Sequence, residues 1–337
     1  MYFSINLVIL ACGFLGSFVF AANSVDVCSS CTYKSVTSAL DSLPADSTVW
    51  TISIAPGTYT EQVKISRSNV ILKPSASGKV QIQYNGMRDT QTSTGTNEQS
   101  ATISVYGSNV KIYDMIIANI YPQTTNIANL ALNLQATQAS FYNVKFYGFQ
   151  DTVLIATGAT SYFKSCYIEG SVDYIWGYGV AYFEATTLGT NKRGGYITAH
   201  KRKDATSVGG FYFNGCTVIP TIPSGPLTST ADPSQSFTSA SQFPNSCYLG
   251  RPWNQYARVV YMNSELYSHI NSGGWAKWST SSPNTDGVLF GEYNNSGPGK
   301  WNATTRVSFA TLLTETEASS YSLGSIFGSI NWIDTIA

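Results

Sequence analysis

Between about residue 105 and residue 220, the chain consists of short runs of β-branched and aromatic residues separated by Gly, Asn, Ser and Thr. Apolar positions in these runs do not recur with the period of an α-helix. Short apolar runs bounded by turn-forming residues are typical of β-strands. The pattern therefore predicts that this part of the chain is built from strands.

The runs share one register. Each has an apolar anchor and a second apolar residue five positions later: Ile112 with Ile117, Phe141 with Phe146, Phe163 with Ile168, Phe183 with Leu188, and Phe213 with Val218. The anchors are 29, 22, 20 and 30 residues apart. A variable period of this size is typical of solenoids, in which each turn covers apolar residues that its neighbour cannot bury alone. We expect an all-β parallel β-helix; a β-sandwich with coincidental spacing is the alternative.

The same register bears on the cysteines. Cys166 and Cys216 each lie three residues after an anchor, two turns apart. At roughly 4.8 Å per turn they would be about 10 Å apart, which is too far for a disulfide, so we expect buried free thiols. Cys28 and Cys31 form a lone C-x-x-C. A zinc site would need a second such pair, so a local disulfide is favoured.

The N-terminus carries an apolar stretch from Ile5 to Ala22 that ends in small residues. We interpret residues 1–21 as a signal peptide and residues 22–337 as a single domain; a membrane anchor is the alternative. Removal of Cys12 with this segment leaves five cysteines, the fifth being Cys247, so at least one is unpaired within the chain. Glycosylation sequons at Asn294 and Asn302 agree with a secreted, extracellular protein that leaves the membrane after cleavage.

Charge adds little. Only 11% of residues are charged and the net charge is zero, which argues against nucleic acid as a partner. The basic run Lys201-Arg202-Lys203 is interpreted as a solvated loop.

Two aspartates occupy the same place on consecutive turns, because Asp151 follows Phe141 by ten residues and Asp173 follows Phe163 by ten. Strand spacing would hold their backbones about 5 Å apart, close enough that the pair titrates as a unit. One carboxyl group can then act as an acid while the other stays ionised, which suits hydrolysis through a covalent intermediate. A retaining glycosidase uses similar spacing, and two ordinary turn aspartates are the non-catalytic alternative.

Other catalytic arrangements are poorly supported. The sequence has no G-x-S-x-G elbow, no H-E-x-x-H and no P-loop. The two histidines, His200 and His269, stand beside no motif of their own, and we expect both to be surface or packed residues.

The sequence motifs around the aspartates resemble those of pectin methylesterases. Four motifs carry the likeness in order: G-T-Y-T-E at 57–61, G-F-Q-D-T at 148–152, G-S-V-D-Y-I-W-G at 170–177 and L-G-R-P-W at 249–253. The likeness runs from about Cys31 to Trp332 and includes Gly274-Trp275 and the segment 290–293. It implies a right-handed parallel β-helix that removes methyl esters from pectin and needs no cofactor or metal.

The resemblance also implies roles. Asp173 would be the nucleophile, and Asp151 would be the acid that protonates departing methanol and then the base that activates water. Arg251 would hold Asp173 ionised, and Gln150 would donate to the oxyanion. Trp253 and Trp275 would line the groove for methyl-esterified homogalacturonan, with a packed core position as the alternative, whereas the first motif would serve the fold. We expect a monomer.

One departure stands out. The family usually carries a second oxyanion glutamine about one turn before G-F-Q-D, and ungapped alignment puts Ala128 there. Loss of one such donor typically costs about 10²–10³ in rate unless Asn129 or Gln135 reaches the site. An active esterase is therefore the first hypothesis and a weakly catalytic pectin-binding β-helix the second. A pectin-cleaving glycosidase or lyase, the third, would not explain the motifs together.

Overall fold

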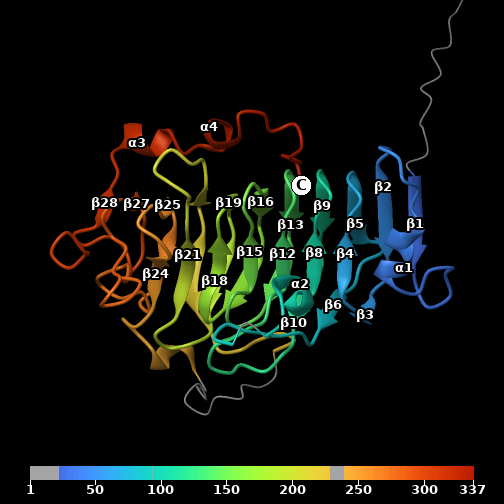
Figure 1. The fold of residues 1–337 in the computed structure, drawn as a ribbon, viewed down its shortest axis with the longest axis horizontal. Coiled ribbons are helices and arrows are strands. Elements are labelled where there is room, and N and C mark those ends of the chain that lie inside the picture. Colours follow the sequence, from blue (N-terminus) through green and yellow to red (C-terminus); the bar gives the residue numbers. More distant parts are fainter. Residues whose placement is uncertain (1–22, 93, 228–238) are drawn as a thin grey trace, which may run out of the picture.

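The computed structural model describes residues 23–92, 94–227 and 239–337, and its parallel strands stack side by side along the long axis of the molecule (Figure 1). The first sheet has eleven strands in the order β1 (Asn23–Val27), β2 (Trp50–Ile54), β5 (Val70–Pro74), β9 (Val110–Tyr113), β13 (Ala139–Tyr142), β16 (Thr160–Lys164), β19 (Val180–Glu184), β22 (Gly210–Asn214), β25 (Arg258–Met262), β27 (Leu289–Tyr293) and β28 (Ala310–Leu312).

Two further sheets run beside it. The second has the order β26 (Glu265–Leu266), β23 (Thr217–Pro220), β20 (Thr187–Thr190), β17 (Tyr167–Gly170), β14 (Lys145–Tyr147), β10 (Ile116–Asn119), β6 (Val80–Tyr84) and β3 (Gly57–Thr60). The third has the order β24 (Tyr248–Pro252), β21 (Tyr196–His200), β18 (Val172–Gly177), β15 (Val153–Ile155), β12 (Leu132–Leu134), β8 (Ile103–Val105) and β4 (Val63–Ile65). Successive strands of the chain visit the sheets in turn, which makes a parallel β-helix.

Few elements lie outside these sheets. The short strands β7 (Arg88–Asp89) and β11 (Ile127–Ala128) pair antiparallel. In the described parts of the chain the helices are α1 (Val36–Asp41), α2 (Asn97–Ser100), the 3₁₀ helix η2 (Ala240–Gln242), α3 (Glu315–Ser319) and α4 (Leu323–Phe327).

The predicted ladder of anchors is confirmed. Phe141 pairs with Ile112 on one side and Phe163 on the other, and Phe183 pairs with Phe163 and Phe213. Successive phenylalanine rings stack with centroids 4.7, 4.6 and 4.5 Å apart. Stacking of like residues from turn to turn builds one continuous core, as a solenoid requires.

On each turn from β9 to β27, a left-handed residue lies two positions after the anchor or, in β25 and β27, after Tyr261 and Glu292, which continue the anchor ladder. The column consists of Asp114, Asn143, Ser165, Ala185, Gly215, Asn263 and Asn294, all with φ between 48° and 63°. Asn, Asp and Gly tolerate this conformation best. Side-chain amides join neighbours in the column, as from Asn143 Nδ2 to Asp114 Oδ1 at 2.8 Å. These residues turn the chain from the first sheet into the second.

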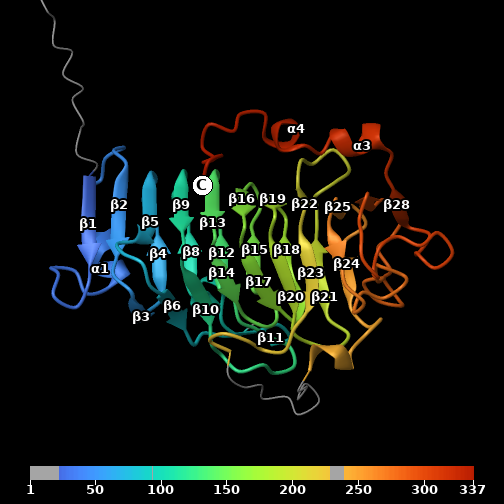
Figure 2. The same cartoon turned by 180° about the vertical axis from the view of Figure 1, so that it is seen from behind.

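The C-terminal segment packs back over the outer face of the first sheet and ends near β9 and β13 (Figure 2). It covers a row of tyrosines, Tyr142, Tyr162, Tyr182 and Tyr212, with Leu313, Ala318, Trp332 and Ile333. The outer face is therefore a second apolar layer, separate from the core inside the helix.

The cysteine predictions are confirmed: Cys28 and Cys31 form a disulfide, and Cys166 and Cys216 are buried free thiols, as is Cys247. The predicted signal peptide lies outside the described residues. Among the described residues, no helix is long and apolar enough to cross a membrane. Asn294 and Asn302 are exposed, and their glycosylation stays a prediction.

The interpretation of the basic run as a solvated loop is wrong for Arg202. Its side chain is buried and donates to the carbonyl oxygens of Tyr256, Ala205 and Ser207. A guanidinium with several carbonyl acceptors can be buried because its donors are satisfied.

Candidate active site

The two predicted aspartates come together where the chain enters the third sheet. Asp151 precedes β15 and Asp173 lies in β18, on the next turn. Both have left-handed backbones, with φ of 63° and 50°, and the Asp151 amide donates to the Val172 carbonyl at 3.0 Å. Each side chain is only 9% exposed. The pairing of like positions predicted from the ladder therefore holds.

Arg251, in β24, holds Asp173 through two hydrogen bonds. Its Nε donates to Oδ1 at 2.9 Å and its Nη2 to Oδ2 at 2.7 Å. The guanidinium lies between the rings of Tyr196 and Trp278, 4.2 and 4.5 Å from their centroids. Burial raises the pKa of Asp173, and the bidentate contact with Arg251 opposes that rise.

Asp151 has a different environment. Burial and the neighbouring Asp173 raise its pKa to about 8, against the opposing charges of Arg88 and Arg251. Its single ion-pair contact is with Arg88, whose Nη2 lies 3.3 Å from Oδ2. The two environments therefore favour protonation of Asp151 over protonation of Asp173.

Both carboxylates open into a cleft of about 350 Å³. It is lined by Arg88, Thr90, Asn126, Gln150, Asp151, Asp173, Trp176, Ala199, Arg251, Trp253 and Trp278. Four of the predicted catalytic residues thus meet at one place with Trp253. Among the described residues, no group of three or more His, Cys, Asp or Glu side chains could hold a metal ion.

The register places Ala128 one turn before Gln150, the place that the ungapped alignment assumes for it. Ala128 pairs with Gln150, which pairs in turn with Val172, so Ala128 is one turn before Gln150 in the same column. Neither proposed substitute reaches the cleft. The Asn129 side chain binds the Phe149 amide and the Tyr121 carbonyl, and Gln135 donates to Asn133.

The expectation for Trp275 is wrong. Its ring is 1% exposed, stacks on Phe290 at 4.2 Å and donates from Nε1 to Glu292 at 2.9 Å, so it belongs to the core. Trp278, three residues later, lines the cleft instead. Trp253 does lie in the cleft, beside Trp176 with ring centroids 5.6 Å apart.

Three residues that line the cleft, Arg88, Trp176 and Trp278, were not predicted from the sequence. Trp176 could have been, because it lies within the V-D-Y-I-W-G motif that carries Asp173. Arg88 lies in a segment without a repeat, so only its position in space identifies it. The two histidines are packed: His200 and His269 are 0% and 1% exposed and lie outside the cleft lining.

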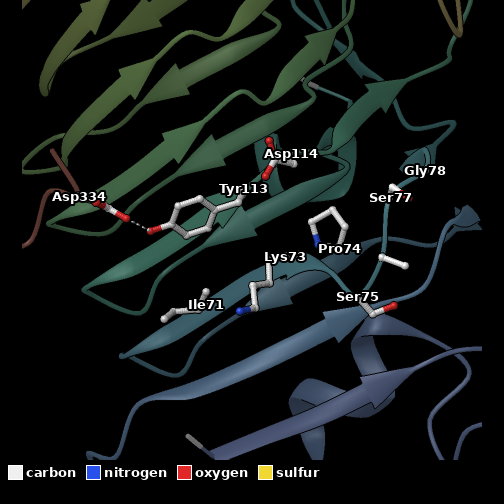
Figure 3. A pocket seen from close by; sticks show the side chains of 10 residues that line it. Ile71, Lys73, Pro74, Ser75, Ser77, Gly78, Tyr113, Asp114 and Asp334 are labelled. Carbon is white, nitrogen blue, oxygen red and sulfur yellow. Dashed lines mark hydrogen bonds between the residues drawn. The ribbon is translucent and has the colours of Figure 1, made fainter. Parts of the chain in front are cut away.

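A larger hollow of about 640 Å³ lies on the outer face of the first sheet, beside the end of the chain (Figure 3). Lys73, Tyr113, Asp114 and Asp334 line it, and Tyr113 donates to Asp334 at 3.1 Å. No pair of buried carboxyl groups faces it. Its size therefore does not make it the better candidate for catalysis.

Known proteins match this chain over most of its length. The pectinesterase family model matches residues 23–329. A pectinesterase of Aspergillus niger is 34% identical over 322 residues, covering 90% of this chain and 88% of that protein, and pectinesterase 1 of Olea europaea is 33% identical over 309 residues, covering 89% and 77%.

Solved structures agree with these matches. Pectin methylesterase from carrot has a TM-score of 0.79 at 26% identity, covering 93% of this chain and 94% of that one. The Aspergillus niger enzyme in penultimately deglycosylated form has a TM-score of 0.75 at 28% identity, covering 94% and 98%. The right-handed parallel β-helix of these neighbours confirms the predicted fold. With a family model and similar relatives that span most of its length, the chain belongs to the pectinesterase family.

Proposed function

We propose that this protein hydrolyses C6 methyl esters of homogalacturonan to free carboxylates and methanol, with Asp173 as nucleophile and Asp151 as acid and base. The observation that carries the proposal is the unequal environment of two neighbouring carboxyl groups. Asp173 is bound by both arms of the Arg251 guanidinium, whereas burial and the charge of Asp173 keep a proton on Asp151. Unequal carboxyl groups at one site can divide nucleophilic and acid roles.

The reaction runs in two halves. An Asp173 oxygen attacks the ester carbonyl carbon, and the tetrahedral intermediate collapses as Asp151 gives its proton to the departing methoxide. Methanol leaves, and the galacturonyl group remains on Asp173 as an anhydride. The Asp151 carboxylate then takes a proton from water, and the hydroxide attacks the acyl carbon. Collapse expels Asp173 as a carboxylate and forms the galacturonic acid group, which loses its proton to water, while Asp151 keeps the proton it took for the next cycle.

Four further cleft residues, Gln150 and three tryptophans, would contribute to charge stabilisation and binding. The Gln150 side chain lines the cleft beside both aspartates and would donate to the oxyanion. Trp253, Trp176 and Trp278 offer aromatic faces to sugar rings. A glycosidase or lyase is less well supported, because curated relatives over 90% of the chain are pectinesterases.

Methanol release from methyl-esterified pectin tests the proposal. Asp173→Asn removes the nucleophile and keeps the side-chain volume, so methanol release should fall at least about 10³-fold in a folded protein. Asp41→Asn, an exposed change on α1, is the matched control and should keep parental activity.

Substantial activity in Asp173→Asn would show that Asp173 is not the nucleophile, and shortened pectin chains from the parent would favour a glycosidase or lyase.

We further propose that the protein is secreted after loss of residues 1–21 and acts as a monomer on pectin outside the cell. N-terminal sequencing of the secreted product would find Ala22 first.

A further inference from the structure

The cleft contains one charged group to which the proposed chemistry assigns no role. Arg88 enters from β7, in the excursion that leads the chain from β6 to β8. β7 and β11 are the one antiparallel pair among the described strands, and they bring Arg88 directly opposite Ala128. The residue opposite the missing glutamine is therefore an arginine.

Directly paired residues of an antiparallel ladder project to the same face. Ala128 belongs to the same buried apolar cluster as Leu154 and Trp176, and Trp176 lines the cleft, so the Ala128 side chain lies on the cleft side. Arg88 lines the same cleft, with its guanidinium carbon 5.9 Å from the Trp176 ring centroid. Its charge thus occupies the side of the cleft toward which a glutamine at position 128 would extend.

The hydrogen-bond donors of the Arg88 guanidinium are only partly used among the described residues. Nη2 contacts Asp151 Oδ2 at 3.3 Å, a long hydrogen bond, and the buried Nε has no hydrogen-bond partner among the described residues. The side chain is 21% exposed, so water screens the charge only in part. A cation that lines the cleft and makes one long hydrogen bond to Asp151 is arranged to meet a developing negative charge there.

We propose that Arg88 supplies the oxyanion donor that Ala128 lacks, its guanidinium donating to the carbonyl oxygen of the scissile ester as that oxygen becomes negative. The inference rests on the proposed function. Gln150 donates from its own turn and Arg88 from the strand paired with the preceding turn, so the oxyanion is held from both sides. A charged donor binds an oxyanion more strongly than a neutral amide does. The exchange of Gln for Ala at position 128 is therefore compensated from β7.

Arg88 also acts on Asp151. The charged groups that face Asp151 are Asp173 from β18, Arg251 from β24 and Arg88 from β7. Arg88 lowers the pKa of Asp151, so its removal raises that pKa further. Because Asp151 must be protonated for methanol to leave, the alkaline limb of the kcat/KM profile should move to higher pH when Arg88 is lost. A merely structural arginine would leave this limb in place.

Arg88→Met tests the inference, because methionine keeps an apolar stem and removes every donor. We expect kcat for methanol release to fall about 10²–10³-fold with a much smaller change in KM. The alkaline limb of the kcat/KM profile should move to higher pH. Arg88→Lys keeps the charge but loses the planar guanidinium, so its kcat should lie between those of the parent and Arg88→Met. Thermal unfolding of each variant reports whether it is folded.

A rescue experiment separates an oxyanion role from a structural one. Ala128→Gln should raise kcat at least about tenfold more in the Arg88→Met background than in the parent, because only there is a donor missing. If Arg88→Met does not fold, the same comparison in the Arg88→Lys background decides, with a smaller expected gain.

Two results would overturn the inference: a folded Arg88→Met variant with kcat within about threefold of the parent and an unmoved alkaline limb, or equal gains from Ala128→Gln in both backgrounds. Failure of the proposed function looks different. In that case the parent itself releases no more methanol than Asp173→Asn does.

Discussion

Asp151 and Asp173 have the same side chain, and their partners make them different. Both are almost fully buried, which alone would raise both pKa values. Arg251 binds both oxygens of Asp173 at 2.9 and 2.7 Å, whereas Arg88 reaches one oxygen of Asp151 at 3.3 Å. Burial and the charge of Asp173 raise the pKa of Asp151, and the single long contact with Arg88 opposes that rise, whereas the bidentate contact with Arg251 opposes the rise in the pKa of Asp173.

Arg251→Lys should therefore lower kcat by about 10- to 100-fold, since lysine keeps the charge but loses one of two charge-assisted hydrogen bonds to Asp173. Binding of pectin should change little. Steady-state kinetics of methanol release checks the prediction, with Arg67→Lys, far from the cleft and bound to Asp46, as the control. An unchanged kcat would make Arg251 structural.

At this scale, the sequence predicted side chains that belong to motifs and missed those that do not. The catalytic candidates lie in short motifs that resemble those of pectin methylesterases, and the ladder places the two aspartates on consecutive turns; they are Gln150, Asp151, Asp173 and Arg251. The Gly274-Trp275 motif does not predict whether the tryptophan side chain points into the core or into the cleft. In the structure Trp275 extends the interior stack with Phe290. Such a face is set by pairing with distant strands, which no local pattern encodes.

At the scale of elements, a turn of this helix is defined by an anchor in the core and a left-handed residue two positions later. The turn column holds Asn, Asp or Gly at most positions, and these residues tolerate positive φ. Ala185 is an exception, with φ of 48° and an exposed side chain. At this position the backbone conformation is dictated by neighbouring turns.

Ala185→Gly should stabilise the fold by about 0.5–1 kcal/mol, because relief of the left-handed penalty exceeds the added entropy of an unfolded glycine. Gly215→Ala is the matched reverse change: its φ is 63° and an added Cβ would meet nothing within 4 Å, so backbone strain alone should destabilise it. Urea unfolding of both variants provides the comparison. Equal shifts in the same direction would refute the assigned role of the turn column.

Strand pairing could be predicted only where the turns are regular. The five-residue spacing between each anchor and the next apolar residue predicted the strand pairing from β9 to β23. The antiparallel contact of β7 with β11 joins two excursions that lie outside the repeat. Because excursions are free of the ladder, their mutual contacts depend on the whole fold. This is why Arg88 could not be placed beforehand.

At the scale of the whole molecule, the end of the chain is tied to its middle. Tyr113 donates to the Asp334 side chain at 3.1 Å, and the Asp334 amide donates to the Tyr142 hydroxyl at 2.6 Å. The segment that carries these contacts covers the outer tyrosine row (Figure 2). Without that cover, the outer face of the first sheet would expose a large apolar surface.

The interior also holds ionisable groups whose titration opposes or favours folding. Burial raises the pKa of Glu169 and Glu292, so these groups bind protons more readily in the folded state. Burial lowers the pKa of His200 and His269 to about 3, so these bind protons more readily when unfolded. The pH dependence of stability in the parent mixes both effects, and a difference between variants is needed to separate them.

His269→Met isolates one of these groups. The folded-state pKa of His269, about 3, lies below its ordinary value of 6.5, so its stabilising effect is fully present above pH 6.5 and is lost as pH falls from 6.5 toward 3. Methionine cannot take up a proton and adapts to the space that the ring leaves. Relative to the parent, the free energy of unfolding of His269→Met should therefore improve by roughly 2 kcal/mol between about pH 7.5 and about pH 4.5, whatever the packing change costs at neutral pH. Leu266→Met, a nearby buried exchange without a titrating group, should show the same difference from the parent at both pH values. If the difference between His269→Met and the parent is also independent of pH, the buried histidine does not contribute to acid lability.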